Sequence, residues 1–138
     1  MKLTSRFQLL AGAALFGAGL FSGLMAAQSG SDVPFRTEQK RSDLSGAPGM
    51  EVIASIVEIK PGETSNMHFH HGIEVAYVLQ GSTVQAPGKE PAVNATGTTI
   101  LNPREMQHGD FKVVGDTPLR LFTVHIVDKG KPLYATPK

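Results

Sequence analysis

The sequence predicts an all-β chain folded as a β-sandwich or barrel. From position 50 onward, short segments rich in β-branched and other apolar residues recur, and turns containing glycine or proline separate them. Strands repeating about every 8–12 residues between such turns are typical of sandwiches and barrels. No segment repeats its apolar residues with the helical period of about 3.6, so helices are not expected in this region.

Residues 1–27 are expected to form a helical secretory signal peptide. Lys2 and Arg6 give a basic start, the following stretch is apolar and free of charge, and small residues precede a cleavage point after Ala27. The apolar run is also long enough for a retained membrane anchor, which is the alternative interpretation. Residues 4–10 resemble a twin-arginine export signal with one arginine missing. We therefore expect a periplasmic or secreted protein that meets the membrane only through this segment, if it is uncleaved.

Residues 28–49 are polar with scattered glycine and proline, which predicts a flexible lead-in with at most a short edge strand. A single domain over 50–138 follows. Its expected strands are 50–59, 65–71, 74–80, 83–86, 92–95, 98–101, 107–114 and 119–128. Proline- or glycine-bearing turns at 61–62, 81–82, 87–91, 102–103 and 115–118 separate them.

The strand over 74–80 is apolar on both faces. The face opposite Glu74 carries Ile73, Val75, Tyr77 and Leu79, because side chains alternate along a strand. A second sheet covers one face, and a second copy of the chain is expected to cover the other, giving a homodimer. The alternative is that the N-terminal segment folds back over that face.

Composition excludes some classes of function and limits the chemistry of any metal site. The chain carries 13 Lys and Arg against 12 Asp and Glu, with no basic stripe, so no nucleic-acid partner is expected. Cysteine is absent, which rules out disulfides and thiolate ligands. A metal site in this chain must therefore use nitrogen and oxygen donors.

Three histidines and one glutamate form the candidate metal site. His68, His70 and Glu74 lie at even spacings, so in an extended chain they share one face. His108 lies in a second segment marked by glycine and proline. The predicted ligands of one divalent transition metal are His68, His70, Glu74 and His108.

These residues resemble the two sequence motifs of the cupin superfamily. The first motif is matched by Gly62, His68, His70, Glu74 and Gly81, and the second by Gly97, Pro103 and His108. Glu105 stands where the family has glycine, and Lys112 where it has asparagine. The resemblance covers residues 50–127 and implies a small jelly-roll β-barrel (a double-stranded β-helix) with one mononuclear metal, of the small, single-domain, exported cupin 2 type.

Four protein ligands on an octahedral ion would leave two positions for water or a small-molecule substrate. Imidazole and carboxylate donors favour iron or manganese, with zinc, nickel and copper also compatible. The hypothesis we favour is a dioxygenase-type oxidoreductase acting on a phenolic or enolic molecule, followed by an isomerase or lyase. The alternatives are a non-catalytic module that binds a small ligand or a metal, and an accessory partner of a larger exported system.

Catalytic residues are not identified by the sequence, although several side chains are candidates. His71 has the opposite parity to the ligands and should point away from them, either at the surface or just outside the ligand set. His125 is interpreted as a core or edge histidine, or alternatively as a proton shuttle in the cavity. Candidate acids, bases or polar groups near the metal are Gln80, Glu105, Gln107 and Asp110, and candidate apolar cavity residues, each also compatible with the core, are Met67, Phe69, Met106 and Phe111.

Overall fold

A computed structural model describes residues 33 and 35–138 of the chain. The signal peptide over 1–27, with its two alternatives, lies outside the described residues and stays a prediction. No helix in the described part of the chain has the length and apolarity needed to cross a membrane.

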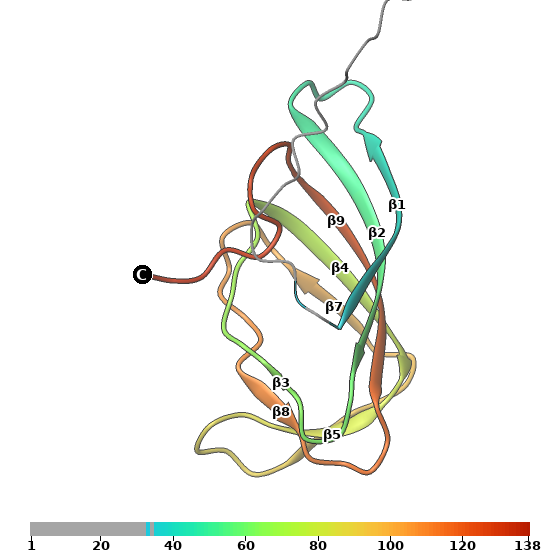
Figure 1. Ribbon diagram of the computed structural model, residues 1–138, viewed down its shortest axis with the longest axis vertical. Helices are drawn as coiled ribbons and strands as arrows, with labels where there is room; N and C mark the ends of the chain where they lie inside the picture. The colour runs from blue at the N-terminus through green and yellow to red at the C-terminus, as the bar shows by residue number, and fades with distance from the viewer. Residues whose placement is uncertain (1–32, 34) are drawn as a thin grey trace, which may run out of the picture.

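The described residues form two antiparallel sheets that face each other as the walls of a jelly-roll barrel (Figure 1). One sheet has the strand order β1-β2-β9-β4-β7 and the other β3-β8-β5-β6. The all-β expectation is confirmed, with no helix among the described residues. The strands are β1 Arg36–Asp43, β2 Met50–Ile59, β3 Thr64–Ser65, β4 Gly72–Gln80, β5 Ser82–Gln85, β6 Ala92–Asn94, β7 Thr99–Asn102, β8 Phe111–Val113 and β9 Leu119–Asp128.

Two expected strands are much shorter than the sequence pattern indicated. The strand expected over 65–71 is reduced to β3, and the one over 107–114 to β8. Between β3 and β4 the chain makes only isolated bridges, His68 to His108 and Phe69 to Ala135. Because these partners come from distant loops, this segment is held by single contacts instead of a continuous ladder.

Part of the expected lead-in is an ordered edge strand. β1 pairs along its length with β2, and the Arg36 guanidinium donates to the Ser55 hydroxyl at 2.7 Å. Arg41 forms ion pairs with Glu38 and with the buried carboxylate of Glu51. A charged edge strand discourages pairing with further chains, which explains why β1 lacks an apolar alternation.

The two ends of the barrel interior differ in polarity. Val57, Ile59, Val78, Val113 and Leu119 form a buried apolar cluster at one end. The buried side chains of β9 are Leu119 at one end, Thr123 and His125 in the part that pairs with Glu74 and its neighbours, and Val127 near the other end. The apolar end holds the fold together, which leaves the other end free for polar groups.

Gly72 allows β4 to lie close to β9. A Cβ atom at this position would lie 2.1 Å from the Ile126 carbonyl oxygen and 2.5 Å from the Val127 Cα. Both are backbone atoms, so a larger residue would force the two strands apart. This close approach brings Glu74, two residues later, opposite His125 in the register of the two strands.

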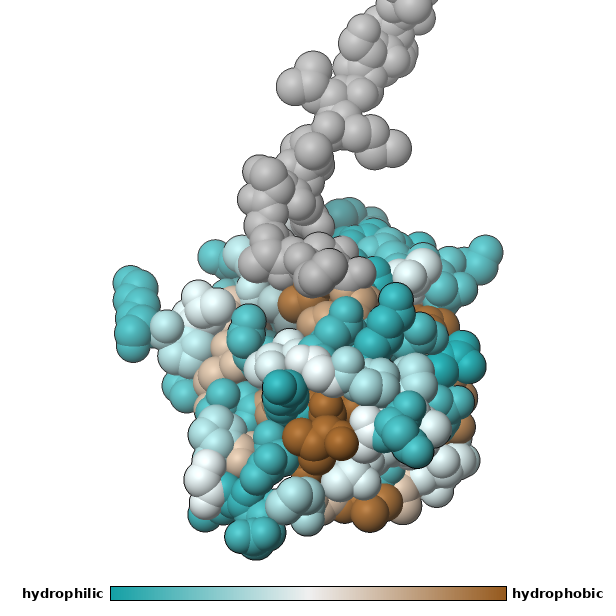
Figure 2. All heavy atoms as spheres, turned by 60° about the horizontal axis from the view of Figure 1, so that its bottom comes forward, coloured by the Kyte–Doolittle hydropathy of each residue, from teal (hydrophilic) through white to brown (hydrophobic). Residues whose placement is uncertain are grey.

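The outer face of the larger sheet exposes the apolar side chains that the sequence placed there. Val75, Tyr77 and Leu79 are exposed, together with Leu101 of β7 and Phe122 of β9. By contrast, the end of the barrel turned forward in Figure 2 is mostly hydrophilic around a small apolar area. The apolar sheet face agrees with the expected homodimer, which stays a prediction.

Candidate metal centre

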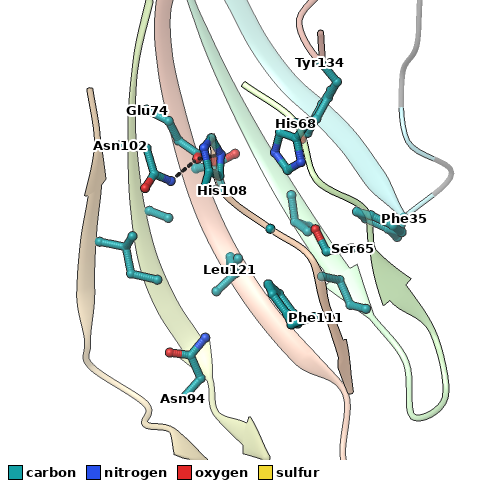
Figure 3. A pocket seen from close by; sticks show the side chains of 16 residues that line it. Phe35, Ser65, His68, Glu74, Asn94, Asn102, His108, Phe111, Leu121 and Tyr134 are labelled. Carbon is teal, nitrogen blue, oxygen red and sulfur yellow. Dashed lines mark hydrogen bonds and ion pairs between the residues drawn. The ribbon is translucent and has the colours of Figure 1, made fainter. Parts of the chain in front are cut away.

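The predicted ligands meet at the polar end of the barrel interior. Figure 3 shows Glu74, His108 and His68 at one end of an internal cavity, with Tyr134 beside His68. His70 and Glu74 are buried, and His68 and His108 are partly exposed. The site lies where β4 and β9 pass the two loops that carry the other histidines.

The two loop histidines are brought together by their own backbones. The His68 N–H donates to the His108 carbonyl at 3.0 Å, and the His108 N–H donates to the His68 carbonyl at 2.9 Å. Their ring centroids are 4.3 Å apart. The structure therefore brings His108 next to His68 of the first motif, as the predicted ligand set implies.

A backbone carbonyl accepts a hydrogen bond from Nδ1 of each of the three histidines. The acceptors are the carbonyls of Asn66 for His68, at 2.7 Å, and of Met106 for His108, at 2.8 Å. The acceptor for His70 is the carbonyl of Leu133. A carbonyl oxygen can only accept, so every Nδ1 carries a proton and every Nε2 of a neutral ring is left with a lone pair.

Three donor atoms form a tight triangle at the centre of the site. Nε2 of His108 lies 3.2 Å from Nε2 of His70 and 3.1 Å from Oε2 of Glu74. Nε2 of His70 lies 3.5 Å from the same carboxylate oxygen. The ligand atom of His68 lies within 4.8 Å of those of His70 and His108.

This donor set fits a cation. Two neutral imidazoles whose Nδ1 atoms are both protonated face each other with two lone pairs, which repel unless a proton or a metal ion lies between them. Ligand atoms about 2.1 Å from one metal at angles of 90–110° are about 3.0–3.4 Å apart, close to the distances of the triangle. Two imidazoles and a carboxylate around one ion are the donor set of mononuclear non-haem iron sites.

His125 lies beside Glu74 in the site, whereas the sequence analysis favoured a core or edge histidine, with a proton shuttle in the cavity as the alternative. Its ring is completely buried, and Nε2 lies 3.3 Å from Oε1 of Glu74. Neither ring nitrogen has a hydrogen-bond partner among the described residues. The ligand atoms of His125, His70 and Glu74 lie within 4.8 Å of one another, so these residues form a group of possible ligands beside that of His68, His70 and His108. In the sequence, His125 shares a strand face with Thr123, which is the pattern that could have placed it inside the barrel. Only the pairing of β9 with β4 shows that it lies opposite Glu74.

The carboxylate of Glu74 is ionised and accepts a hydrogen bond from the side chain of Asn102. Burial raises the pKa of Glu74, but the surrounding imidazoles of His108, His125 and His70 outweigh this and hold it well below the ordinary range. Asn102 donates to Oε2 at 2.7 Å. For His108, burial lowers the pKa, and hydrogen bonding to Glu74 more than compensates, so the net shift is upward.

A cavity of about 140 Å³ adjoins these residues. Its walls are mostly apolar, and among the described residues no lysine or arginine lines it. Apart from the site residues, its polar groups are neutral. Lining residues are Phe35, Val57, Ile59, Ala76, Ile100, Phe111 and Leu121, with Ser65, Asn94, Asn102 and Thr123 among the polar ones.

Most of the other candidates from the sequence lie outside this cavity. Gln80 donates to the Pro118 carbonyl, and Asp110 lines a separate surface pocket. Glu105 accepts a hydrogen bond from His71 at 2.9 Å, and its φ of 62° is the left-handed conformation that a glycine would favour. Gln107 is exposed. Of the four apolar candidates, only Phe111 lines the cavity. Met67 and Met106 are exposed, and Phe69 pairs with Ala135.

We expect Gly109→Ala to disturb the orientation of His68. Gly109 has a φ of 86°, and a Cβ would lie 2.5 Å from the Asn66 carbonyl and 3.1 Å from Nδ1 of His68. Metal affinity should fall by about 10-fold or more, as for other losses of a partner to a metal-bound imidazole, measured by competition with a chelator. Gly88→Ala is the matched control, because Gly88 also has a positive φ but nothing within 4 Å.

The metal-free protein should lose stability as the pH falls from about 6.5 towards 4. Burial, supported by the neighbouring His108 and His70, lowers the pKa of His68 to about 4, although the Asn66 carbonyl opposes the shift. The unfolded state, with a pKa of about 6.5, then takes up a proton that the folded state does not. The loss is at most about 3 kcal/mol and smaller for a partly exposed ring.

Urea denaturation of the metal-free protein across this pH range measures the effect. His125 contributes in the same direction, because burial lowers its pKa as well. His108 contributes in the opposite direction, because its pKa is raised. In His68→Gln the decline should be smaller, and an identical decline would contradict the assignment.

Comparisons with known proteins agree with this architecture. The model of the family described as Cupin domain matches residues 55–125. An uncharacterized conserved protein with a double-stranded β-helix domain from Klebsiella pneumoniae is similar with a TM-score of 0.55 and 14% identity, over 74% of this chain and 84% of that one. No curated protein matches the chain.

Two further solved structures resemble the chain less closely. A cupin domain from Bordetella pertussis has a TM-score of 0.46 at 16% identity, over 70% of this chain and 98% of that one. The polyketide cyclase RemF from Streptomyces resistomycificus has a TM-score of 0.49 at 20% identity, over 72% of this chain and 81% of that one. At these identities the likeness concerns the fold.

Proposed function

This chain belongs to the cupin domain family, and we propose that it is a metal-dependent enzyme acting on a small molecule. One divalent transition metal would be held by His68, His70, Glu74 and His108, with His125 close to the carboxylate. When bound, the metal would polarise a substrate oxygen as a Lewis acid or, if redox-active, support oxidation by dioxygen.

The triangle of donor atoms is the observation that carries this proposal. Its three distances of 3.1, 3.2 and 3.5 Å join two imidazole nitrogens and one carboxylate oxygen. The carbonyls that accept from Nδ1 hold His70 and His108 with their Nε2 atoms directed inward. Because Glu74 is ionised and the site is partly buried, it suits a divalent cation better than a proton alone.

We favour iron or manganese as the metal, with zinc, nickel and copper as alternatives. Two imidazoles and a carboxylate with further open positions are typical of non-haem iron oxygenases. This preference supports dioxygenase-type oxidoreductase chemistry ahead of isomerase or lyase chemistry.

The cavity supports a small, mostly apolar substrate. Its volume of about 140 Å³ is close to that of a cavity of roughly 150 Å³ that holds benzene in another protein, so one ring fits. Since no cationic side chain among the described residues lines it, a substrate oxygen would be recognised by the metal and by neutral groups such as Ser65 and Asn94. A single-ring phenol or a small enol meets these conditions.

A non-catalytic module that binds a small ligand or a metal is the second candidate. The observation that favours it is the scarcity of acids and bases in the cavity, where Tyr134 is the only described titratable side chain outside the histidines and Glu74. We further propose that the protein is exported to the periplasm or secreted, and that it forms a homodimer through the apolar sheet face.

The proposal is tested by elemental analysis of the protein purified from its native compartment. We expect about one transition-metal ion per chain, lost in His70→Ala and kept in His71→Ala. His71 is the matched control, because its Nδ1 donates to Glu105 outside the candidate centre. Oxygen consumption is then measured with single-ring phenols and enols, using two-ring analogues as size controls.

These measurements test the ligand assignment and distinguish an enzyme from a binding module. Metal bound equally by both alanine variants would contradict the site. Metal bound at full stoichiometry, with a single-ring ligand bound but no turnover, would favour the binding module over the enzyme.

A further inference from the structure

The last ten residues, 129–138, follow β9 and bring Tyr134 into the wall of the cavity beside the ligands; we refer to them as the C-terminal strap. Ala135 is fastened to the ligand segment by two hydrogen bonds: its N–H donates to the Phe69 carbonyl at 3.0 Å, and its carbonyl accepts from the Phe69 N–H at 2.9 Å. At the start of the strap, the Lys129 N–H donates to the Gly49 carbonyl at 2.8 Å. The strap is therefore held at Lys129 and at Ala135, with Leu133 and Tyr134 between these attachments.

Of the three carbonyls that accept from Nδ1 of His68, His70 and His108, only the one in the strap is distant in sequence from its histidine. His68 and His108 each donate from Nδ1 to the carbonyl two residues earlier, an arrangement that each loop provides by itself. His70 has no such local partner for Nδ1 in the structure and donates to Leu133, 63 residues later. The tautomer of His70 thus depends on the position of the strap, whereas the other two do not.

Tyr134 places an aromatic ring against the same imidazoles. It is 6% exposed, and its ring centroid lies 4.8 Å from that of His68 and 5.1 Å from that of His70. Figure 3 shows it at the end of the cavity where the histidines gather. A buried ring in this position excludes water from one side of the centre and limits the rotation of both imidazoles.

We infer that the C-terminal strap is a positioning element of the metal centre, in which the Leu133 carbonyl fixes the tautomer of His70 and Tyr134 packs the imidazoles in place. The strap lies beyond residues 55–125, the part that the family model matches. The inference rests on the proposed function for its effect on metal binding. Its effect on the His70 tautomer exists without any metal.

Deletion of residues 133–138 tests the inference in two ways. Imidazole ¹⁵N chemical shifts of the metal-free protein report the tautomer of each histidine, and chelator competition reports metal affinity. We expect His70 to lose its preference for a protonated Nδ1 while His68 and His108 keep theirs. Metal affinity should fall about 10–100-fold, the range found when a partner of a metal-bound imidazole is lost.

Two point variants keep the test decisive if the deletion does not fold. Ala135→Pro removes the N–H that donates to Phe69, and Tyr134→Ala removes the packed ring; both should weaken metal binding in the same direction. The controls are deletion of 136–138 and Lys131→Ala, which leave the contacts of Leu133, Tyr134 and Ala135 intact.

The possible results separate the inference from the proposed function. Folded strap variants with an unchanged His70 tautomer and unchanged metal affinity would overturn the inference. A full-length chain that binds no transition metal would overturn the proposed function, and the His70 tautomer would still decide whether the strap positions this side chain.

Discussion

Replacing His108 with alanine is expected to abolish tight metal binding and leave a folded barrel. His108 contributes two of the three short distances in the central triangle, to His70 and to Glu74. Loss of an indirect partner costs about 10–100-fold in affinity, so loss of a ligand itself should exceed 100-fold. Metal content after dialysis and chelator competition measure the loss.

The barrel should survive this substitution because its apolar cluster lies at the other end of the interior. Val57, Ile59 and Leu119 are buried members of that cluster, and the hydrogen bonds and ion pairs of the His108 side chain involve none of them. Glu74 keeps the hydrogen bond from Asn102. We expect a cooperative thermal transition and a far-ultraviolet spectrum close to those of the metal-free parent.

His71→Ala is again the appropriate control for His108→Ala. It removes an imidazole from the neighbouring surface without touching the triangle, so full metal stoichiometry is expected. If His108→Ala and His68→Ala both retained the metal at the affinity of the parent, the ligand assignment would be refuted.

The long strands of the fold were predictable from sequence. The boundaries expected for 50–59 and 119–128 are those of β2 and β9, because both strands are rich in β-branched residues and end at turns. β1 was not predictable in the same way, because its sequence is polar on both faces and its order comes from backbone pairing with β2. The short strands around His68 and His108 depend on partners that no local pattern specifies.

The same distinction applies to the site. Parity placed His68, His70 and Glu74 on one face, and motif spacing identified His108. The role of His125 depends on the register that pairs it with Glu74, which parity along a single strand does not determine. The contact between Leu133 and His70 joins the end of the chain to its middle and has no counterpart in residue spacing.

Glu74→Gln should show that a negative charge, beyond the shape of the side chain, organises the centre. Glutamine keeps the volume of glutamate, but its amide is neutral, and if its NH₂ group took the place of Oε2 it would face the amide of Asn102, which is already a donor. We expect metal affinity to fall by more than 100-fold, because the site would keep only neutral ligands for a divalent cation.

The metal-free variant provides a second readout that does not depend on metal. The pKa of His108 is raised because Glu74 stabilises its charged form against the cost of burial. Without the carboxylate, burial dominates, so the pKa of His108 should move below its ordinary value. An NMR titration of the His108 ring follows this change directly.

Glu51→Gln is the matched control for this substitution. Glu51 is also buried, at 3% exposure, and its carboxylate pairs with Arg41 at 2.8 Å on the side of β1. Its replacement should lower the free energy of unfolding without changing metal affinity or the titration of His108. If Glu74→Gln left both the metal affinity and the pKa of His108 unchanged, the carboxylate would have no part in the centre, and an arrangement of three imidazoles alone would replace the one described here.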